Sequence, residues 1–139
     1  MAKYKIIIDT NLWISFLIGK RLSALKSLLS NSDLTVSVCG ELLIEIQNIS
    51  SKQKIKKYIN NDDVIDLFIV IDNYCQFTHI KQDTVSLDLR DTKDLYLLSL
   101  ADTVNADYIL TGDKDLLTLK LHNKTKIVTY NDFTYMIGS

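Results

Sequence analysis

Short apolar runs alternate along the chain with longer segments in which apolar residues recur every three or four positions. The short runs are rich in β-branched residues and predict strands at 4–8, 34–38, 77–80, 108–110 and 126–130. The longer segments predict helices at 11–30, 41–58, 62–74, 92–105 and 114–121, with caps at Asn61 or Asp62 and at Asn131. Strands that alternate with helices indicate βαβ units, so the expected fold class is α/β with a mostly parallel sheet.

Two aspartates follow predicted strands directly. Asp9 comes after the first strand, and Asp113 follows the strand at 108–110. In parallel sheets, ligands bind beyond the carboxyl ends of the strands, near the point where the strand order reverses. If these two strands are neighbours, both carboxylates meet at one edge of the sheet.

Other acidic residues occupy related positions. Glu45 lies in the helix after the second strand, and Asp94 opens the helix before the fourth strand. Asp91 precedes Asp94 by one turn, and Asp115 is two residues after Asp113. Carboxylates gathered in one cleft repel each other, and a hard divalent cation relieves that repulsion. A bound Mg²⁺ or Mn²⁺ activates water and stabilises the leaving oxygen in phosphodiester hydrolysis. The pattern therefore favours a metal-dependent site built from oxygen ligands.

Each acid also has a simpler interpretation. An aspartate after a strand often caps the next helix, as Asp9 would, and Asp113 fits an ordinary turn. Asp94 suits the positive end of its helix, and Glu45 suits a solvated helix face. Glu41, four residues before Glu45, lies on a similar face and is an alternative second acid. Only the joint placement at one sheet edge favours a shared function.

The length and charge of the chain limit the class of protein. With 139 residues, the chain is expected to form one domain over residues 1–139 with a real hydrophobic core. Lys plus Arg (16) nearly balance Asp plus Glu (17), which argues against tight passive binding to nucleic acid. A metal ion that anchors phosphate locally weakens that objection. A basic run at 52–57 is a candidate phosphate contact, although a solvated helix face is the simpler interpretation.

The cysteines and histidines do not form a recognisable metal motif. Cys39 and Cys75 are far apart in the sequence, as are His79 and His122, so a zinc site is not expected. The two cysteines are expected to be buried free thiols. No apolar run is long enough to span a bilayer, and no signal-peptide pattern opens the chain. A cytoplasmic location is the resulting expectation.

These motifs resemble the PIN-domain family, specifically the toxin ribonucleases (VapC-like) of bacterial and archaeal toxin–antitoxin pairs. The opening segment 6–15 has the family's hydrophobic strand followed by Asp-Thr-Asn. The stretch 91–101 is similar to the third acidic motif, and 106–117 is similar to the closing motif nearly residue for residue. The middle segment 37–58 resembles the part that carries the second acid, with Glu45 as the best match.

The resemblance implies a three-layer α/β/α domain with a central, mostly parallel sheet and Mg²⁺- or Mn²⁺-dependent cleavage of single-stranded RNA. It implies an acidic quartet of Asp9, Glu45, Asp94 and Asp113. In that set, Asp9, Asp94 and Asp113 ligate metal. It further implies supporting roles for Thr10, Asn11, Thr111 and Asp115. Because members of the family commonly form homodimers and bind a small antitoxin protein, the resemblance also implies these two partners. The RNA target, the number of metal ions and any cleavage of DNA stay open.

Two other interpretations compete with a nuclease. A phosphoacceptor receiver domain shares the alternating order, but Asp9-Thr10-Asn11 lacks its adjacent acid pair and the last strand ends without its lysine. A catalytically silent PIN-like domain that only binds RNA or protein is the stronger alternative. The intact acidic set argues against it, and metal-dependent turnover would separate the two.

Overall fold

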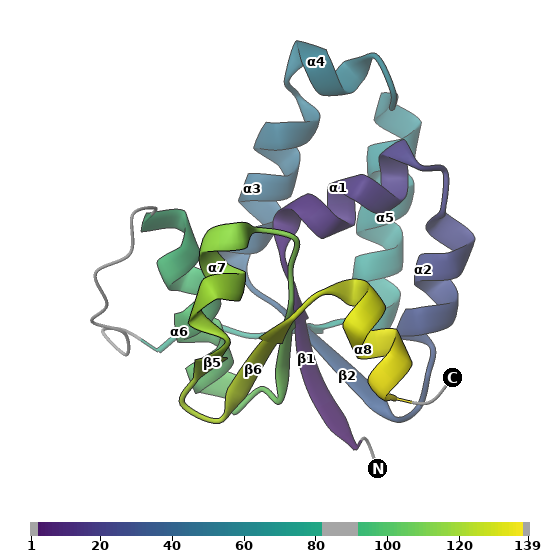
Figure 1. Cartoon of the computed structure of the whole chain (residues 1–139). Helices are drawn as coiled ribbons and strands as arrows, with labels where there is room; N and C mark the ends of the chain where they lie inside the picture. Colours follow the sequence, from purple (N-terminus) through teal and green to yellow (C-terminus); the bar gives the residue numbers. More distant parts are fainter. Residues whose placement is uncertain (1–2, 82–91, 138–139) are drawn as a thin grey trace.

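The computed structural model describes residues 3–81 and 92–137, with residues 92–94 described by their backbone alone (Figure 1). The strands in these ranges are β1 (Tyr4–Ile8), β2 (Leu34–Val38), β3 (Gln76–Phe77), β4 (Tyr108–Leu110), β5 (Leu121–His122) and β6 (Thr125–Val128). The helices are α1 (Thr10–Ile18), α2 (Leu22–Leu29), α3 (Gly40–Ser50), α4 (Gln53–Lys56), α5 (Asn61–Tyr74), α6 (Thr92–Val104), α7 (Lys114–Leu119) and α8 (Tyr130–Met136).

The strands form one sheet in the order β3-β2-β1-β4-β6-β5, and every pair is parallel except β5 with β6. β1 lies at the centre, with Ile6 opposite Val36 on β2 and Ile8 opposite Leu110 on β4. Because β1 is covered on both faces, Ile6, Ile7 and Ile8 are all fully buried. The predicted mostly parallel sheet is confirmed.

The connections place helices on both faces of this sheet. The crossovers from β1 to β2 and from β2 to β3 run in one direction, and those from β3 to β4 to β6 run in the other. Right-handed crossovers therefore put α1, α2, α3 and α5 on one face and α6 and α7 on the other. In agreement, α1 and α5 pack against each other and against α2, while α6 contacts β1 and β4. The predicted three-layer α/β/α architecture is confirmed.

A buried tryptophan ties the first helix to the central strand. Trp13 on α1 is fully buried, and its indole nitrogen donates a hydrogen bond of 2.9 Å to the carbonyl oxygen of Ile8. The bond fixes the start of α1 directly above the end of β1, where Asp9 joins the two elements. Trp13 is thus a core residue.

Two predicted helices are each divided in the structure. The pattern at 11–30 forms α1 and α2 because the chain turns at Gly19 and at Lys20, whose φ of 55° no helix allows. The pattern at 41–58 forms α3 and α4, which are separated at Ser51 and Lys52. Hydrophobic spacing continues across both breaks, so it does not reveal them.

Other local details also differ from the prediction. α5 is capped by Asn60, whose side chain accepts from the Asp63 amide in a capping box, rather than by the two residues that follow it. α8 is capped by Thr129 rather than Asn131. The two-residue strand β5 was not predicted; it pairs with β6 across a tight turn that includes Asn123 at φ 51°. None of these differences alters the order of the sheet.

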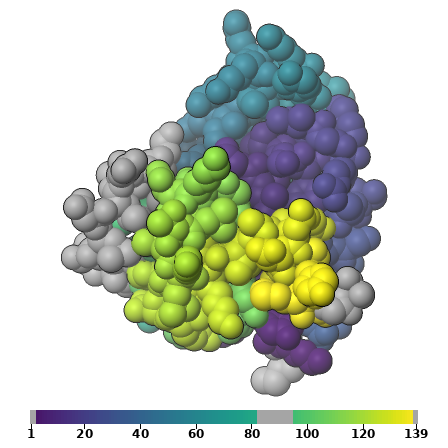
Figure 2. Space-filling view, viewed as in Figure 1, coloured from purple at the N-terminus to yellow at the C-terminus, as the bar shows by residue number. Residues whose placement is uncertain are grey.

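The space-filling view shows how the two halves of the chain meet on one side of the molecule (Figure 2). The green and yellow C-terminal elements cover the lower front, and the teal α4 forms the opposite tip. No helix in the described part of the chain has both the length and the apolar character needed to cross a bilayer.

Candidate active site

Asp9 and Thr111 lie side by side at the carboxyl edge of the sheet. The Asp9 amide donates 2.9 Å to the Leu110 carbonyl, which extends the pairing of β1 with β4 by one residue. Across this junction the Thr111 hydroxyl donates 2.7 Å to Asp9 Oδ2, and both side chains are buried. Strand order reverses between β1 and β4, so the pair occupies the place where such sheets bind ligands.

The Asp9 carboxylate does not cap the following helix. Asp9 occupies the N-cap position of α1, but its side chain makes no capping hydrogen bond. Burial raises the pKa of Asp9 above its usual value of 3.8, whereas the Thr111 hydroxyl and the Thr10 amide lower it. The charges of Glu45 and Asp113 raise the pKa of Asp9 further. The structure thus excludes the simple capping role and places Glu45 and Asp113 within electrostatic reach of Asp9.

Asp113 has both a capping role and a place beside Asp9. Its Oδ1 accepts 2.8 Å from the Asp115 amide at the start of α7, and its own amide donates 3.0 Å to the Thr111 hydroxyl oxygen. The Thr111 hydroxyl is therefore hydrogen-bonded both to the Asp9 carboxylate and to the backbone amide of Asp113. Asp115 contributes its backbone to this arrangement, and its exposed side chain is not among the groups that shift the pKa of Asp9.

Glu45 reaches the site through a tyrosine. The Tyr96 hydroxyl on α6 donates 3.0 Å to Glu45 Oε1 on α3, and it also lies 3.0 Å from the Thr10 hydroxyl on α1. An ionised carboxylate can only accept a hydrogen bond, so the Tyr96 hydroxyl donates its hydrogen to Glu45. The Thr10 hydroxyl must then donate to the Tyr96 oxygen. These two bonds fix Glu45 relative to the first residue after Asp9.

Sequence reasoning missed Tyr96. Burial, followed by the charges of Glu45 and Asp9, raises the pKa of Tyr96 well above its usual value of 10, so the hydroxyl stays a neutral donor. The residue lies two positions after Asp94 in an otherwise apolar stretch of α6. No spacing rule distinguishes it from the leucines around it.

The remaining predicted residues are less closely involved in what the structure describes. Glu41 is exposed, and its charge adds to the effect of burial in raising the pKa of Cys39 to about 11. Glu45, in contrast, accepts a hydrogen bond from Tyr96 and is among the groups that shift the pKa of Asp9, so the structure favours Glu45 as the second acid. Asn11 is exposed on α1. The backbone of Asp94 lies in the first turn of α6, but its side chain, like the whole of Asp91, lies outside the described residues.

The described acids suit a hard cation that keeps much of its water. None of the ion pairs found in the described ranges involves Asp9, Glu45 or Asp113, so these charges have no protein cation as partner there. The donors are all oxygens, and one carboxylate is buried. Within the same residues no three His, Cys, Asp or Glu side chains come close enough to chelate an ion on their own. Mg²⁺ binds through one or two carboxylates plus waters, so this donor set fits it.

Comparisons with known proteins agree with this geometry. A family model described as PIN domain matches residues 5–115, well over half of the chain. No match was found among curated protein sequences.

Two solved structures are similar in fold. One is a chain of VapBC2 from Rickettsia felis, crystallised bound to a DNA fragment from their promoter. It is 17% identical with a TM-score of 0.54, and the match covers 88% of this chain and 96% of that one. The other is the T. brucei RRP44 PIN domain, which is 13% identical with a TM-score of 0.53. That match covers 99% of this chain and 82% of that one.

Proposed function

The chain belongs to the PIN domain family, and we propose that it is a metal-dependent endoribonuclease that cleaves single-stranded RNA. The observation that supports this most is the set of acids at the carboxyl edge of the sheet. Glu45 and Asp113 lie within electrostatic reach of Asp9 where strand order reverses, and none of the three acids is paired with a protein cation in the described residues.

In this proposal each residue has a distinct task. Asp9, Asp94 and Asp113 hold Mg²⁺ or Mn²⁺, which when bound polarises the phosphate and lowers the pKa of water. Glu45, oriented by Tyr96, holds metal or orients the attacking water. Thr111 fixes the Asp9 carboxylate by its hydrogen bond. Water adds to the phosphodiester, the bond to the 3′ oxygen breaks and that oxygen takes a proton, which leaves a 5′-phosphate and a 3′-hydroxyl.

We further propose that the protein acts as the toxin of a toxin–antitoxin pair in the cytoplasm, as one domain over residues 1–139. The fold similarity to a chain of the VapBC2 complex supports this proposal. A small antitoxin protein would then be its regulatory partner.

A homodimer is part of the same proposal. α5 and the edge strand β3 expose several large apolar side chains: Ile65 (55%), Ile69 (53%) and Phe77 (50%). Exposed apolar groups of this size, gathered on neighbouring elements, are typical of surfaces that bind protein. Sedimentation of the wild type and of an Ile65→Lys/Ile69→Lys variant would test this surface.

Cleavage assays with a matched inactive variant would test the nuclease. Purified wild type and Asp9→Asn/Asp94→Asn protein are incubated with single-stranded and structured RNA in Mn²⁺, Mg²⁺ or EDTA. Contaminating ribonuclease would act equally in both preparations. Cleavage by the wild type alone, lost in EDTA, supports the proposal. Equal behaviour across several RNAs would favour the silent binding domain, and the preparation would then be checked for a copurified partner.

A further inference from the structure

Two adjoining hollows lead away from Glu45 along α3. The first, of about 340 Å³, is lined by Glu45 and Tyr96 and extends to Ile49 and Lys52. The second, of about 310 Å³, shares Ile49 and Lys52 and extends to Lys54. Since they share two residues, the hollows form one groove, which we call the α3 groove, from the acids to the start of α4.

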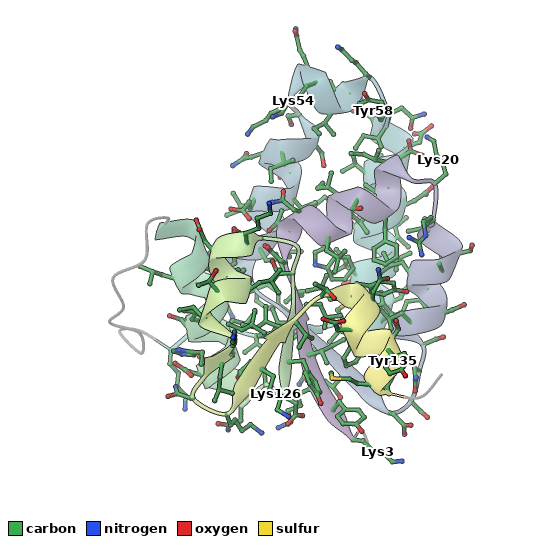
Figure 3. All side chains as sticks on the ribbon, in the orientation of Figure 1. Lys3, Lys20, Lys54, Tyr58, Lys126 and Tyr135 are labelled. Carbon is green, nitrogen blue, oxygen red and sulfur yellow. The ribbon has the colours of Figure 1, made fainter. Side chains whose placement is uncertain are left out.

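The basic run at the far end of this groove does not act as a single patch. Lys52 and Lys54 line the α3 groove, whereas Lys56 lines a separate hollow beside α5. Lys54 lies on α4, near the tip of the molecule farthest from the sheet (Figure 3). Lys52 stands at the N-cap position of α4 without a capping side-chain bond. Neither lysine is in an ion pair with any of the described residues.

Half of the residues that line the second hollow are isoleucines from three helices: Ile14, Ile18, Ile49 and Ile55. The polar residues Asn11 and Ser15 and the two lysines complete the lining. The apolar part suits contact with bases and sugars, and the lysines suit phosphates. A base in a duplex keeps its faces stacked on its neighbours, so the combination favours a single strand.

We propose that the α3 groove carries a single-stranded RNA away from the acids and that Lys52 and Lys54 bind its phosphates. The inference rests on the proposed function. Glu45 and Ser50, the last residue of α3, are five residues apart, or about 7.5 Å at a helical rise of ~1.5 Å per residue, and Lys52 lies two residues beyond. The lysines therefore meet the strand a few nucleotides from the cleaved bond.

The net charge of the chain makes these two lysines important. With a net charge of −1, the protein has no general attraction for a polyanion. Two cations placed along the path of the strand then carry a large share of the salt-dependent binding. Each phosphate contact with a single strand contributes about 0.7 to the slope of log affinity against log salt, so the pair contributes about 1.4.

The test measures binding rather than cleavage. An Asp9→Asn background without added divalent metal and a fluorescent single-stranded RNA gives Kd at a series of monovalent salt concentrations. The test variant adds Lys52→Ala/Lys54→Ala. The matched control adds Lys3→Ala/Lys126→Ala, which removes the same charge from exposed lysines at the opposite end of the molecule (Figure 3). A Lys52→Arg/Lys54→Arg variant keeps the charge in place.

The proposal predicts a slope smaller by about 1.4 in the test variant only. Between about 50 and about 200 mM salt, the control then loses about sevenfold more affinity than the test variant. The arginine variant keeps the full slope. Equal slopes in test and control variants would overturn the groove inference, and the groove would then be examined for a protein partner.

Failure of this inference differs from failure of the proposed function. If the wild type cleaves RNA while the lysine pair has no effect on the slope, the nuclease stands and the path is wrong. If the pair sets the slope while no metal supports cleavage, the groove stands and the protein is a silent RNA-binding domain. A single-stranded RNA that binds none of the variants contradicts both.

Discussion

The two ends of the sheet use aspartates in opposite ways. At the amino end, Asp107 accepts from the Lys5 amide and pairs with Lys124 at 3.3 Å, and Asp102 contacts His122 at 3.1 Å. At the carboxyl end, Asp9 is more deeply buried but takes its hydrogen bond from a neutral hydroxyl. Structural acids here have a basic partner, whereas the acids of the candidate site have none in the described residues.

This difference separates stability from function in a measurable way. A buried carboxylate without a cation destabilises the folded protein when it ionises, because burial favours its neutral form. A bound metal ion removes that cost. The acids of the carboxyl edge are therefore expected to matter for metal binding and turnover, and the acids of the amino edge for folding alone.

The largest effect is expected from Asp9→Asn. The change removes a proposed metal ligand, and since losing even a group that only orients a ligand costs 10–100-fold, we expect cleavage to fall by more than about a hundredfold. The pKa of Asp9 is raised in the folded state, so ionisation costs stability above the usual value of 3.8. The metal-free variant should therefore melt at or above the wild-type temperature, measured by calorimetry near neutral pH.

Asp107→Asn is the matched change at the other end. It weakens a partly exposed pair with Lys124, so the free energy of unfolding should fall by no more than about 1 kcal/mol while cleavage stays at the wild-type rate. Loss of cleavage in this variant would break the distinction between the two edges.

Two buried threonines allow a second comparison. Thr111 donates to Asp9, and Thr125 donates 2.7 Å to the Ala106 carbonyl at the amino end. Replacing either with valine leaves a buried acceptor without its donor, which costs about 1–3 kcal/mol in the free energy of unfolding. Only Thr111→Val is expected to weaken metal-dependent cleavage, because only Thr111 orients a proposed ligand. Denaturant melts and initial rates measured on both proteins give the answer, and equal rates would contradict the role of Thr111.

Tyr96→Phe should have a smaller and more selective effect. It removes the hydroxyl that holds Glu45 and accepts from Thr10, while the ring that fills the space stays. A hydrogen bond to a charged group is worth about 1.5 kcal/mol, so kcat should fall about tenfold while KM changes little. Tyr135→Phe, at a side chain that is 88% exposed, is the control. A rise in KM with kcat unchanged would mean that Tyr96 acts in substrate binding instead.

The smallest effect is expected from the pH dependence of stability that the Cys75 thiol causes. Burial alone raises the pKa of the Cys75 thiol to about 12 from 9.0. A raised folded-state pKa means that stability falls as pH rises above about 9, because only the unfolded chain ionises readily there. Chemical melts between about pH 8 and pH 10 should show this decline, reduced in Cys75→Ala. An identical decline in both proteins would assign it to other groups.

Much of the site could be predicted because it depends on the strands. Asp9 and Asp113 each follow a short apolar run, and parallel strands bring such positions to one edge without further information. The sequence could not decide between Glu41 and Glu45, since residues four apart share a helix face. That choice depends on Tyr96, which is 51 residues from Glu45 along the chain.

The local errors have a different origin. The break after α1 and the hairpin of β5 with β6 each include a residue in a left-handed conformation, Lys20 at φ 55° and Asn123 at φ 51°. The break after α3 arises instead from the extended backbone of Lys52, with ψ 139°. Hydrophobic periodicity reports which face is buried and carries no signal for one residue in a left-handed conformation. The Asn60 cap was missed for a similar reason, because three consecutive polar residues offer alternative starts for α5.

Calorimetric titration of Mn²⁺ and Mg²⁺ into the wild type and into Asp9→Asn is the most direct test of the unpaired acids. We expect saturable binding to the wild type, with a melting temperature that rises as the metal concentration exceeds Kd. At a hundredfold excess over Kd the stabilisation is about 2.7 kcal/mol. The Asp9→Asn protein should show neither effect. Equal binding and equal thermal shifts in the two proteins would contradict a metal site at the carboxyl edge of the sheet.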